Sequence, residues 1–343
     1  MSRRMADDLK RIIGIDNKSR PLEKRDPLPR VMGGYGVSII EGETQTVEPV
    51  VAAMPDVYVA FESNGIRLNE ENEFAIASGS GFSTHTAFTF NNSWCVHSEN
   101  IWFLDDDGGP VENKKAVIKN NGTIMQSFGL WYDDYAFGDS GVTSTKDYLW
   151  IAASYDSMQS LQLLKCDPMD GSLIESIMID ETTNAFMNYQ VKGICATENY
   201  IHIAGLNDNG NFHVLFDISA GSWIKTEYPW ASLSFGPEVG SAYGDEVCFV
   251  VQDYSLSFNT RQVWILPESG NFDNATKISQ PVSQSNRMAG AGITEGKIIS
   301  TFRSSNEIQI YDRVSGIWTS LGDYGFLQGA AVTSDPSPIP PAP

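Results

Sequence analysis

The feature that most constrains this chain is a repeated pair of short apolar strands joined by a polar turn that contains a glycine. The turn glycines follow one another at intervals of 57, 49, 50, 49 and 46 residues, at Gly65, Gly122, Gly171, Gly221, Gly270 and Gly316. Glycine suits such turns because a hairpin turn places one residue at positive φ. The near-constant interval predicts a structural unit that recurs along the chain.

A second hairpin precedes five of these turns, so that each copy of the repeat offers four strands. These hairpins cover residues 95–104, 141–154, 193–205, 240–251 and 291–302. Large side chains expected to pack between the units occur at Trp102, Trp150, Phe249, Trp264 and Trp318. Four short strands every 46 to 57 residues are typical of a propeller blade. The sequence therefore predicts an all-β chain that folds as a single β-propeller of six four-stranded blades, with five or seven blades as alternatives.

The sixth copy is divided between the two ends of the chain. Residues 329–335 match the opening strand of a blade, but the Pro-rich sequence after them lacks the N–H groups that a strand ladder needs. The strands within residues 57–68 have no opening strand before them. We therefore expect N- and C-terminal strands to pair and close the ring, with one strand from residues 36–52 completing the blade.

Charge and composition divide the chain into three segments. We expect an extended basic N-terminal arm over residues 1–35, the propeller over 36–335 and a Pro-rich tail over 336–343. The net charge is −20, of which residues 1–30 contribute +4 and the remainder −24. Because so acidic a body repels phosphate backbones, we expect the propeller not to bind nucleic acid.

The sequence offers no sign of export or membrane insertion. No apolar run approaches the roughly 20 residues needed to cross a bilayer, and the N-terminus lacks the apolar stretch of a secretory signal. We expect a cytoplasmic location unless the chain belongs to a virion. Four scattered cysteines are expected to be buried free thiols: Cys95, Cys166, Cys195 and Cys248.

Neither a catalytic site, a cofactor site nor a metal site is predicted. The run Asp105–Asp107 lacks the spacing of an EF-hand loop. None of the four histidines, His85, His97, His202 and His213, belongs to a helical ligand pair. His202 and His213 lie on predicted strands of one blade and are expected to be structural. The turn acids are expected to cap their hairpins through side-chain to backbone hydrogen bonds: Asp167, Asp217 and Asp312.

One connection combines aromatic and acidic residues within residues 130–141. Its members are Trp131, Tyr132, Asp133, Asp134 and Tyr135. An aromatic ring can cover a sugar face while a carboxylate accepts the sugar hydroxyls, so this stretch is a candidate carbohydrate contact. The alternative is that the aromatic rings pack between blades and the acids face water.

The layout of the chain resembles that of virion proteins of tailed bacteriophages. The resemblance rests on the basic arm (residues 5–34), the signal-free start and a divergent propeller with Ser-, Asn- and Gly-rich strands. It implies a non-enzymatic structural or assembly protein of a tail, tail-tip or head-to-tail part, with other virion proteins as partners. The candidate partner contacts of the arm are Arg3, Arg4, Lys10, Arg11, Ile12 and Ile13. A carbohydrate-binding or glycoside-cleaving propeller acting on a surface polysaccharide is the open alternative.

Overall fold

The computed structural model describes sixteen stretches of the chain. They are residues 57–60, 64–68, 76–83, 94–97, 100–105, 114–119, 124–129, 135–155, 160–169, 171–181, 189–229, 235–253, 260–281, 288–302, 307–323 and 331–334. The chain forms two compact units, Met1–Ala53 and Met54–Pro343, and all described residues belong to the second. The predicted arm, the Pro-rich tail and the strand expected within residues 36–52 lie outside the described residues.

The described residues form six antiparallel sheets of four strands each. The first sheet has the order β24 (Ala331–Ser334), β1 (Val57–Ala60), β2 (Asn64–Leu68), β3 (Ile76–Ser83). The second contains β4 (Trp94–His97), β5 (Asn100–Asp105), β6 (Lys114–Lys119) and β7 (Ile124–Gly129). The third contains β8 (Tyr135–Ser144), β9 (Leu149–Tyr155), β10 (Ser160–Cys166) and β11 (Leu173–Glu181).

The remaining three sheets also pair their strands in chain order. The fourth contains β12 (Gln190–Ala196), β13 (Tyr200–Asn207), β14 (Gly210–Asp217) and β15 (Ser222–Pro229). The fifth contains β16 (Phe235–Tyr243), β17 (Glu246–Asp253), β18 (Arg261–Pro267) and β19 (Thr276–Ser279). The sixth contains β20 (Met288–Ile293), β21 (Lys297–Phe302), β22 (Glu307–Asp312) and β23 (Ile317–Asp323).

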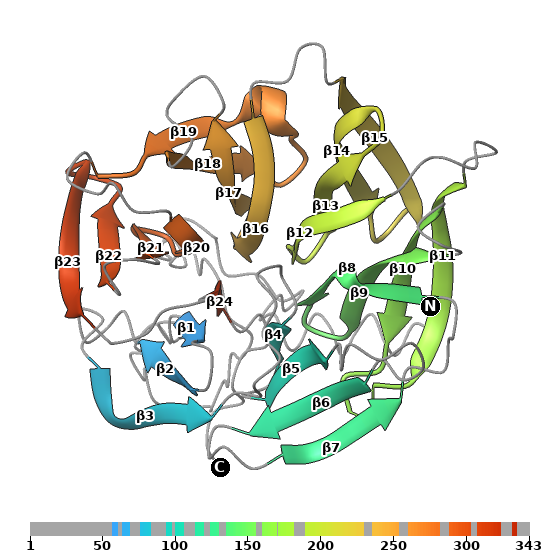
Figure 1. Cartoon of the computed structure of the whole chain (residues 1–343), viewed down its shortest axis with the longest axis horizontal. Coiled ribbons are helices and arrows are strands. Elements are labelled where there is room, and N and C mark those ends of the chain that lie inside the picture. The colour runs from blue at the N-terminus through green and yellow to red at the C-terminus, as the bar shows by residue number, and fades with distance from the viewer. Residues whose placement is uncertain are drawn as a thin grey trace, which may run out of the picture. The chain divides into compact units, whose positions relative to one another are not determined.

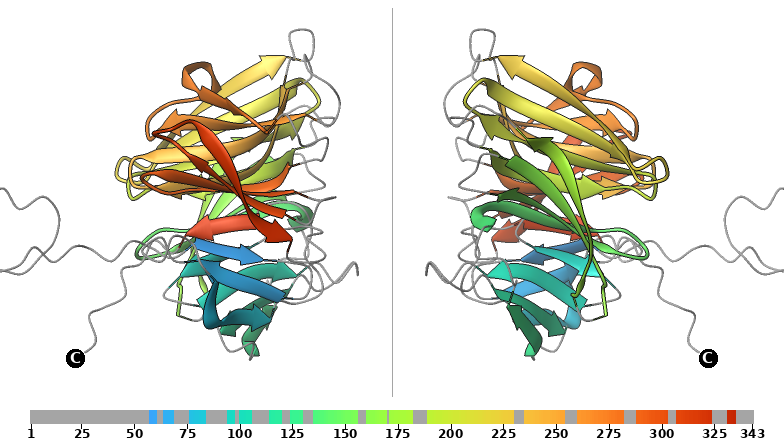
Figure 2. Two further views of the ribbon diagram at one scale, coloured as in Figure 1. Left: turned by 90° about the vertical axis from the view of Figure 1, so that its left-hand side faces the viewer. Right: turned by 90° about the vertical axis from the view of Figure 1, so that its right-hand side faces the viewer.

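Within residues 54–343 the sheets follow one another around a common centre (Figure 1). The innermost strands are β24, β4, β8, β12, β16 and β20, and each contacts the next around the circle. The outermost strands are β3, β7, β11, β15, β19 and β23. Side views show that the strands of a sheet are rotated relative to one another, the twist that L-amino acids impose on sheets (Figure 2).

The core consists of apolar layers between successive sheets. Trp150 and Phe216 share one layer between the third and fourth sheets, and Phe249 lies in the next layer with Trp264. Neighbouring residues of one strand enter different layers because strand side chains alternate in direction. On β17, for example, Cys248 packs toward the sixth sheet and Phe249 toward the fourth. The predicted role of the large aromatic residues between the units is therefore confirmed.

The five predicted second hairpins are confirmed as the pairs β4–β5, β8–β9, β12–β13, β16–β17 and β20–β21. Three of the predicted turn glycines have positive φ: Gly171 at 72°, Gly221 at 61° and Gly316 at 72°. Glycine is required at these positions by backbone conformation, because side chains with a Cβ rarely adopt it.

Two other turn glycines were interpreted wrongly. Gly65 lies inside β2, where it pairs with Ala60. Gly270 lies in a longer connection, which contains a 3-10 helix at Phe272–Asn274, and its φ is not positive. At this position glycine is favoured for steric reasons, because a Cβ would lie 2.7 Å from the ring of Pro267. In the first repeat the glycine therefore lies in a strand and not in a turn. In the fifth repeat it lies in a longer connection that differs from the turns at Gly171, Gly221 and Gly316.

The pairing of the two chain ends is confirmed, with one correction. β24 pairs with β1 through four residue pairs, from Val57↔Ser334 to Ala60↔Ala331. The fourth strand of this sheet is β3, which follows β2 in the chain, and not a strand from residues 36–52. The prediction failed because the hairpin in residues 57–68 joins the second and third strands of its sheet, whereas the matching hairpins elsewhere join the third and fourth.

The four cysteines are buried free thiols, as predicted: Cys95, Cys166, Cys195 and Cys248. A search of the described residues finds no helix of the length and apolarity that crossing a membrane requires.

Candidate functional site

The structure places few of the site residues that the sequence predicted. Tyr135 is the first residue of β8 and pairs with Tyr155 of β9. The other residues named for glycan contact or arm contact lie outside the described residues: Trp131, Tyr132, Asp133, Asp134, Arg3, Arg4, Lys10, Arg11, Ile12 and Ile13. Both contacts therefore stay predictions.

Among the described histidines, the structure brings His202 of β13 and His213 of β14 together. Both are buried, and Nδ1 of His202 lies 3.1 Å from Nε2 of His213. Nε2 of His202 lies 2.8 Å from the carbonyl oxygen of Glu268. Because a carbonyl can only accept, Nε2 of His202 donates this bond, and its Nδ1 accepts from the N–H of His213. The structural role predicted for these two histidines is confirmed.

The surroundings keep both imidazoles neutral near pH 7. Burial lowers the pKa of His202 to about 4, and burial with the nearby His202 lowers the pKa of His213 well below its usual value. The His213 ring packs against Phe249 and Phe272, with centroid separations of 6.4 and 5.1 Å. The pair thus connects the fourth sheet to the fifth without carrying charge.

A threonine organises the turn between the first two strands of three sheets. The backbone N–H of Thr145, Thr197 and Thr294 donates a 2.9 Å bond to the carbonyl of the residue three positions later. The hydroxyls of Thr197 and Thr294 accept the N–H of that same residue at 3.1 Å. The hydroxyl of Thr145 instead accepts Nε1–H of Trp150 at 3.0 Å. A recurring threonine followed three positions later by Tyr or Lys was visible in the sequence, but its meaning was missed.

The acids of the outer turns cap their hairpins as predicted. Asp167 accepts the N–H of Met169 at 2.7 Å, and Asp217 accepts the N–H of Ala220 at 2.8 Å. Asp312 accepts two backbone N–H groups, at 3.0 and 2.7 Å, and also pairs with Lys297. The hydrogen bond from the N–H of Ala220 lowers the pKa of Asp217. The pKa of Asp312 is lowered more strongly, mainly by the hydrogen bond from Lys297.

Polar side chains join neighbouring sheets at these turns. Glu268, in the turn after β18, accepts the hydroxyl of Thr197 at 2.7 Å and the side-chain N–H of Asn199 at 2.9 Å. Thr197 and Asn199 belong to the turn between β12 and β13 of the preceding sheet. The outer turn of one sheet is therefore bonded to the inner turn of the sheet before it.

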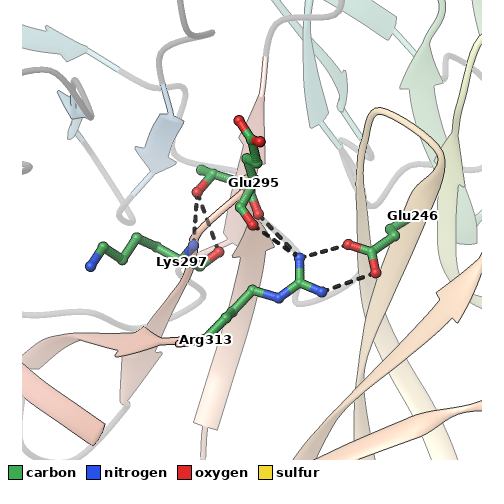
Figure 3. A network of polar contacts seen from close by, with 5 residues as sticks. Glu246, Glu295, Lys297 and Arg313 are labelled. Carbon is green, nitrogen blue, oxygen red and sulfur yellow. Dashed lines mark hydrogen bonds and ion pairs between the residues drawn. The ribbon is translucent and has the colours of Figure 1, made fainter. Parts of the chain in front are cut away.

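The next pair of sheets repeats this joint with different residues (Figure 3). Arg313, in the turn after β22, donates to both carboxylate oxygens of Glu246, at 2.6 and 2.9 Å. The same guanidinium reaches the carbonyl oxygens of Thr294 and Glu295, at 3.5 and 3.3 Å. The bond to Glu246 raises the pKa of Arg313. Arg313 therefore bonds both to Glu246 of the fifth sheet and to the turn between β20 and β21 of its own sheet, and so connects the two sheets.

Burial also shifts the pKa values of two cysteine thiols in the described structure. Burial raises the pKa of the Cys195 thiol well above its usual value and that of Cys248 to about 11. Both sulfurs are therefore protonated at neutral pH and are poor nucleophiles. Within the described residues, no group of three or more His, Cys, Asp or Glu side chains is placed to hold a metal ion.

Four innermost strands carry a break in register, after which the strand resumes at a glycine. The glycines are Gly141, Gly193, Gly240 and Gly290 in β8, β12, β16 and β20, at intervals of 52, 47 and 50 residues. At Gly240 a Cβ would lie 2.7 Å from the ring of Phe249. Bulges of this kind redirect side chains and are common beside binding sites. This second periodic glycine signal was also missed in the sequence.

No protein-family model matches the chain, and no curated protein matches it. Among solved structures, it is similar to a chain in the crystal structure of a nidogen/laminin complex, with a TM-score of 0.54 and 9% identity. That match covers 82% of this chain and 99% of the other.

Two further similarities are weaker. A chain in the structure of the Dos1 propeller has a TM-score of 0.41 and 9% identity, and covers 80% of this chain and 69% of its own. A chain of hydrazine synthase from Kuenenia stuttgartiensis has a TM-score of 0.45 and 10% identity, with 80% of each chain covered. Taken with the four-stranded sheets around a common centre, the match to the nidogen/laminin complex supports the fold alone: the chain is an all-β protein with the β-propeller fold.

Proposed function

We propose that this chain is a non-enzymatic assembly protein, a six-bladed β-propeller whose basic N-terminal arm docks on neighbouring subunits. In this proposal each of the six sheets is one blade. The layout resembles that of virion proteins of tailed bacteriophages, so we further propose a tail-associated virion component with other virion proteins as its partners. The arm comprises residues 1–35, and its contacts are Arg3, Arg4, Lys10, Arg11, Ile12 and Ile13.

The observation that carries the proposal is the separation of charge along the chain. Residues 1–30 carry +4, whereas the rest of the chain carries −24. Opposite charges on two surfaces steer association and fix its orientation. An extended segment of this length reaches about 100 Å at roughly 3.3 Å per residue, which is enough to contact another subunit.

In the described propeller, several charged side chains connect turns and sheets, which agrees with a role in assembly. Glu268, Arg313 and Asp312 are engaged in bonds that hold turns and sheets together. A scaffold needs rigid sheets, and these bonds supply rigidity between the units. The arrangement therefore favours a protein that presents surfaces over one that performs chemistry.

Deletion of residues 1–30 tests the proposal. The deletion lies within the unit Met1–Ala53, so the melting temperature of the propeller should change little. Incorporation into the particle that contains the protein should be lost, as measured by electron microscopy and by sedimentation of assembled particles. A truncated protein that is incorporated as efficiently as the full chain would refute the proposal.

A second candidate function is carbohydrate binding by residues 130–141. The break in register between Ala136 and Gly141 favours it, because it places a bulge on the innermost strand β8 directly after the aromatic and acidic residues. Binding of a polysaccharide panel, lost in Asp133→Asn or Asp134→Asn, would support this function. Turnover lost in the same variants would instead identify an enzyme.

A further inference from the structure

The turn between β13 and β14 contains one of the three Asn–Gly sequences of the chain, Asn209–Gly210. Asparagine is chemically labile, most of all before glycine, because glycine has no side chain to hinder attack of its own nitrogen on the asparagine side chain. Asn64–Gly65 lies inside the paired strand β2, and Asn121–Gly122 lies outside the described residues. Asn209 is exposed in a turn, so its side chain is accessible to water.

Two features of the fold require glycine at position 210. The φ of Gly210 is +149°, a value that residues with a Cβ rarely adopt. A Cβ at this position would also lie 2.0 Å from the carbonyl oxygen of Tyr228 on β15, which is closer than non-bonded atoms approach. A larger residue after Asn209 would slow the attack, but the fold does not admit one.

The side chain of Asn207 binds the backbone N–H groups of this turn. Asn207 is buried and pairs with Gly210 across the turn. Its Oδ1 accepts the N–H of Asn209 at 3.0 Å and the N–H of Gly210 at 3.1 Å. The nitrogen of Gly210 must lose its proton and turn toward the side chain of Asn209 before it can attack. Both hydrogen bonds therefore oppose the reaction.

We propose that Asn209 is a site of spontaneous deamidation and that Asn207 sets its rate. The backbone nitrogen of Gly210 attacks the side-chain carbonyl carbon of Asn209, and the new C–N bond closes a succinimide ring. The Cγ–Nδ2 bond breaks, and the amide nitrogen leaves as ammonia with the proton of the Gly210 N–H. Water, the only other reactant, opens the ring at either carbonyl and leaves aspartate or isoaspartate. The inference is independent of the proposed function, because its residues all lie in the fourth sheet.

The product changes the turn in two ways. Either form replaces a neutral amide by a carboxylate, which is ionised at neutral pH. Isoaspartate also leads the chain through the side-chain carbon, which adds one atom to the backbone between Asn207 and Gly210. Because these two residues are paired and enclose only Asp208 and Asn209, the longer backbone should loosen this end of β13 and β14.

The test follows the peptides of the full chain by mass spectrometry during storage at mildly alkaline pH. Asn207→Ala should speed the conversion of Asn209 about fivefold, which is the rate equivalent of one hydrogen bond. Asn207→Asp keeps an acceptor oxygen at the same position and should retain the slow rate. The peptide that contains Asn121 is the internal control, because its rate should be the same in the parent chain and in Asn207→Ala.

Concentrated urea provides the second comparison, because unfolding removes the turn. In urea the parent chain and Asn207→Ala should convert Asn209 at the same rate, and the folded parent should convert it more slowly. This comparison holds even if Asn207→Ala does not fold. A folded parent that converts as fast as the unfolded chain overturns the protection.

Three further results would contradict the proposal. Equal rates at Asn209 in the folded parent and in folded Asn207→Ala overturn the role of Asn207. Faster conversion of both Asn209 and Asn121 in this variant assigns the effect to a general loss of structure and overturns that role as well. If neither folded chain converts Asn209 while the unfolded chain is fully converted, Asn209 is not a modification site of the folded protein.

Discussion

Arg313 donates two hydrogen bonds to the two carboxylate oxygens of Glu246 across the boundary between two sheets, at 2.6 and 2.9 Å. Paired N–H groups of a guanidinium match the two oxygens of a carboxylate in distance and direction. The bond therefore fixes the position of one turn against the other. The Thr197–Glu268 bond performs the same task one sheet earlier, so both of these boundaries are stabilised by a polar contact of their own.

Loss of the Arg313–Glu246 pair should destabilise the propeller modestly. Arg313→Ala or Glu246→Ala is expected to lower the free energy of unfolding by about 1 kcal/mol, because both side chains are partly exposed to water and salt. Urea unfolding of the two single variants and the double variant would measure the coupling. Strict additivity of the two single effects would mean that the bond contributes nothing to stability.

The His202–His213 pair should make the propeller sensitive to acid. The pKa of His202 in the fold is about 4, below the value of about 6.5 expected in the unfolded chain, so the unfolded chain binds more protons between these values. The contribution of His202 to the free energy of unfolding should thus be fully present above about pH 6.5. It should fall by about 3 kcal/mol as the pH drops toward 4. Urea unfolding at several pH values measures the slope.

A double variant supplies the comparison for the histidine pair. His202→Gln with His213→Leu removes both titrating rings from the interface. Carboxylates elsewhere contribute their own pH dependence, so the informative quantity is the difference between the two slopes. Identical slopes from pH 6.5 to 4.5 would show that the pair does not govern acid stability.

Removal of the last strand should open the first sheet. Deletion of residues 327–343 removes β24 and leaves β1 without its inner partner, so soluble yield should fall sharply. Deletion of residues 336–343 keeps β24 and should leave the melting temperature almost unchanged. A normal melting temperature in the longer deletion would contradict the importance of this pairing.

Replacing Gly221 by asparagine should destabilise the propeller less than replacing it by alanine. A Cβ at this position would meet no atom within 4 Å, so its φ of +61° is the source of any cost. Gly221→Ala should lower the free energy of unfolding by about 1 kcal/mol, and Gly221→Asn by less, because asparagine tolerates this region better. Thermal unfolding of the two variants would check the order, which reverses if packing rather than φ decides the cost.

The sequence predicted those parts of the fold that depend on local chemistry. Gly171, Gly221 and Gly316 revealed the repeat because a turn with positive φ restricts the residue type wherever the turn occurs. Gly65 was misplaced because a glycine within a strand looks the same in a sequence as a glycine within a turn. The regular interval of the other copies then favoured the wrong alignment of the first one.

The contacts between sheets could not be predicted in the same way. Thr197 and Glu268 are 71 residues apart, and nothing near either residue specifies the other. Trp223 and Trp318 each lie two residues after a turn glycine with positive φ, yet among the described residues only Trp318 is seen to donate its Nε1–H to a carbonyl of the neighbouring sheet. Such differences arise from the neighbouring sheet, which a local pattern does not describe.

The pairing of β24 with β1 also has a consequence for synthesis on the ribosome. The strands β1, β2 and β3 are translated before the other five sheets, whereas the strand that completes their sheet is translated after all of them. At roughly 5–20 residues per second, the inner edge of β1 waits for tens of seconds before its partner exists. The nascent chain therefore passes through a stage in which this edge is open to wrong partners, including the β1 edges of chains growing on the same messenger RNA.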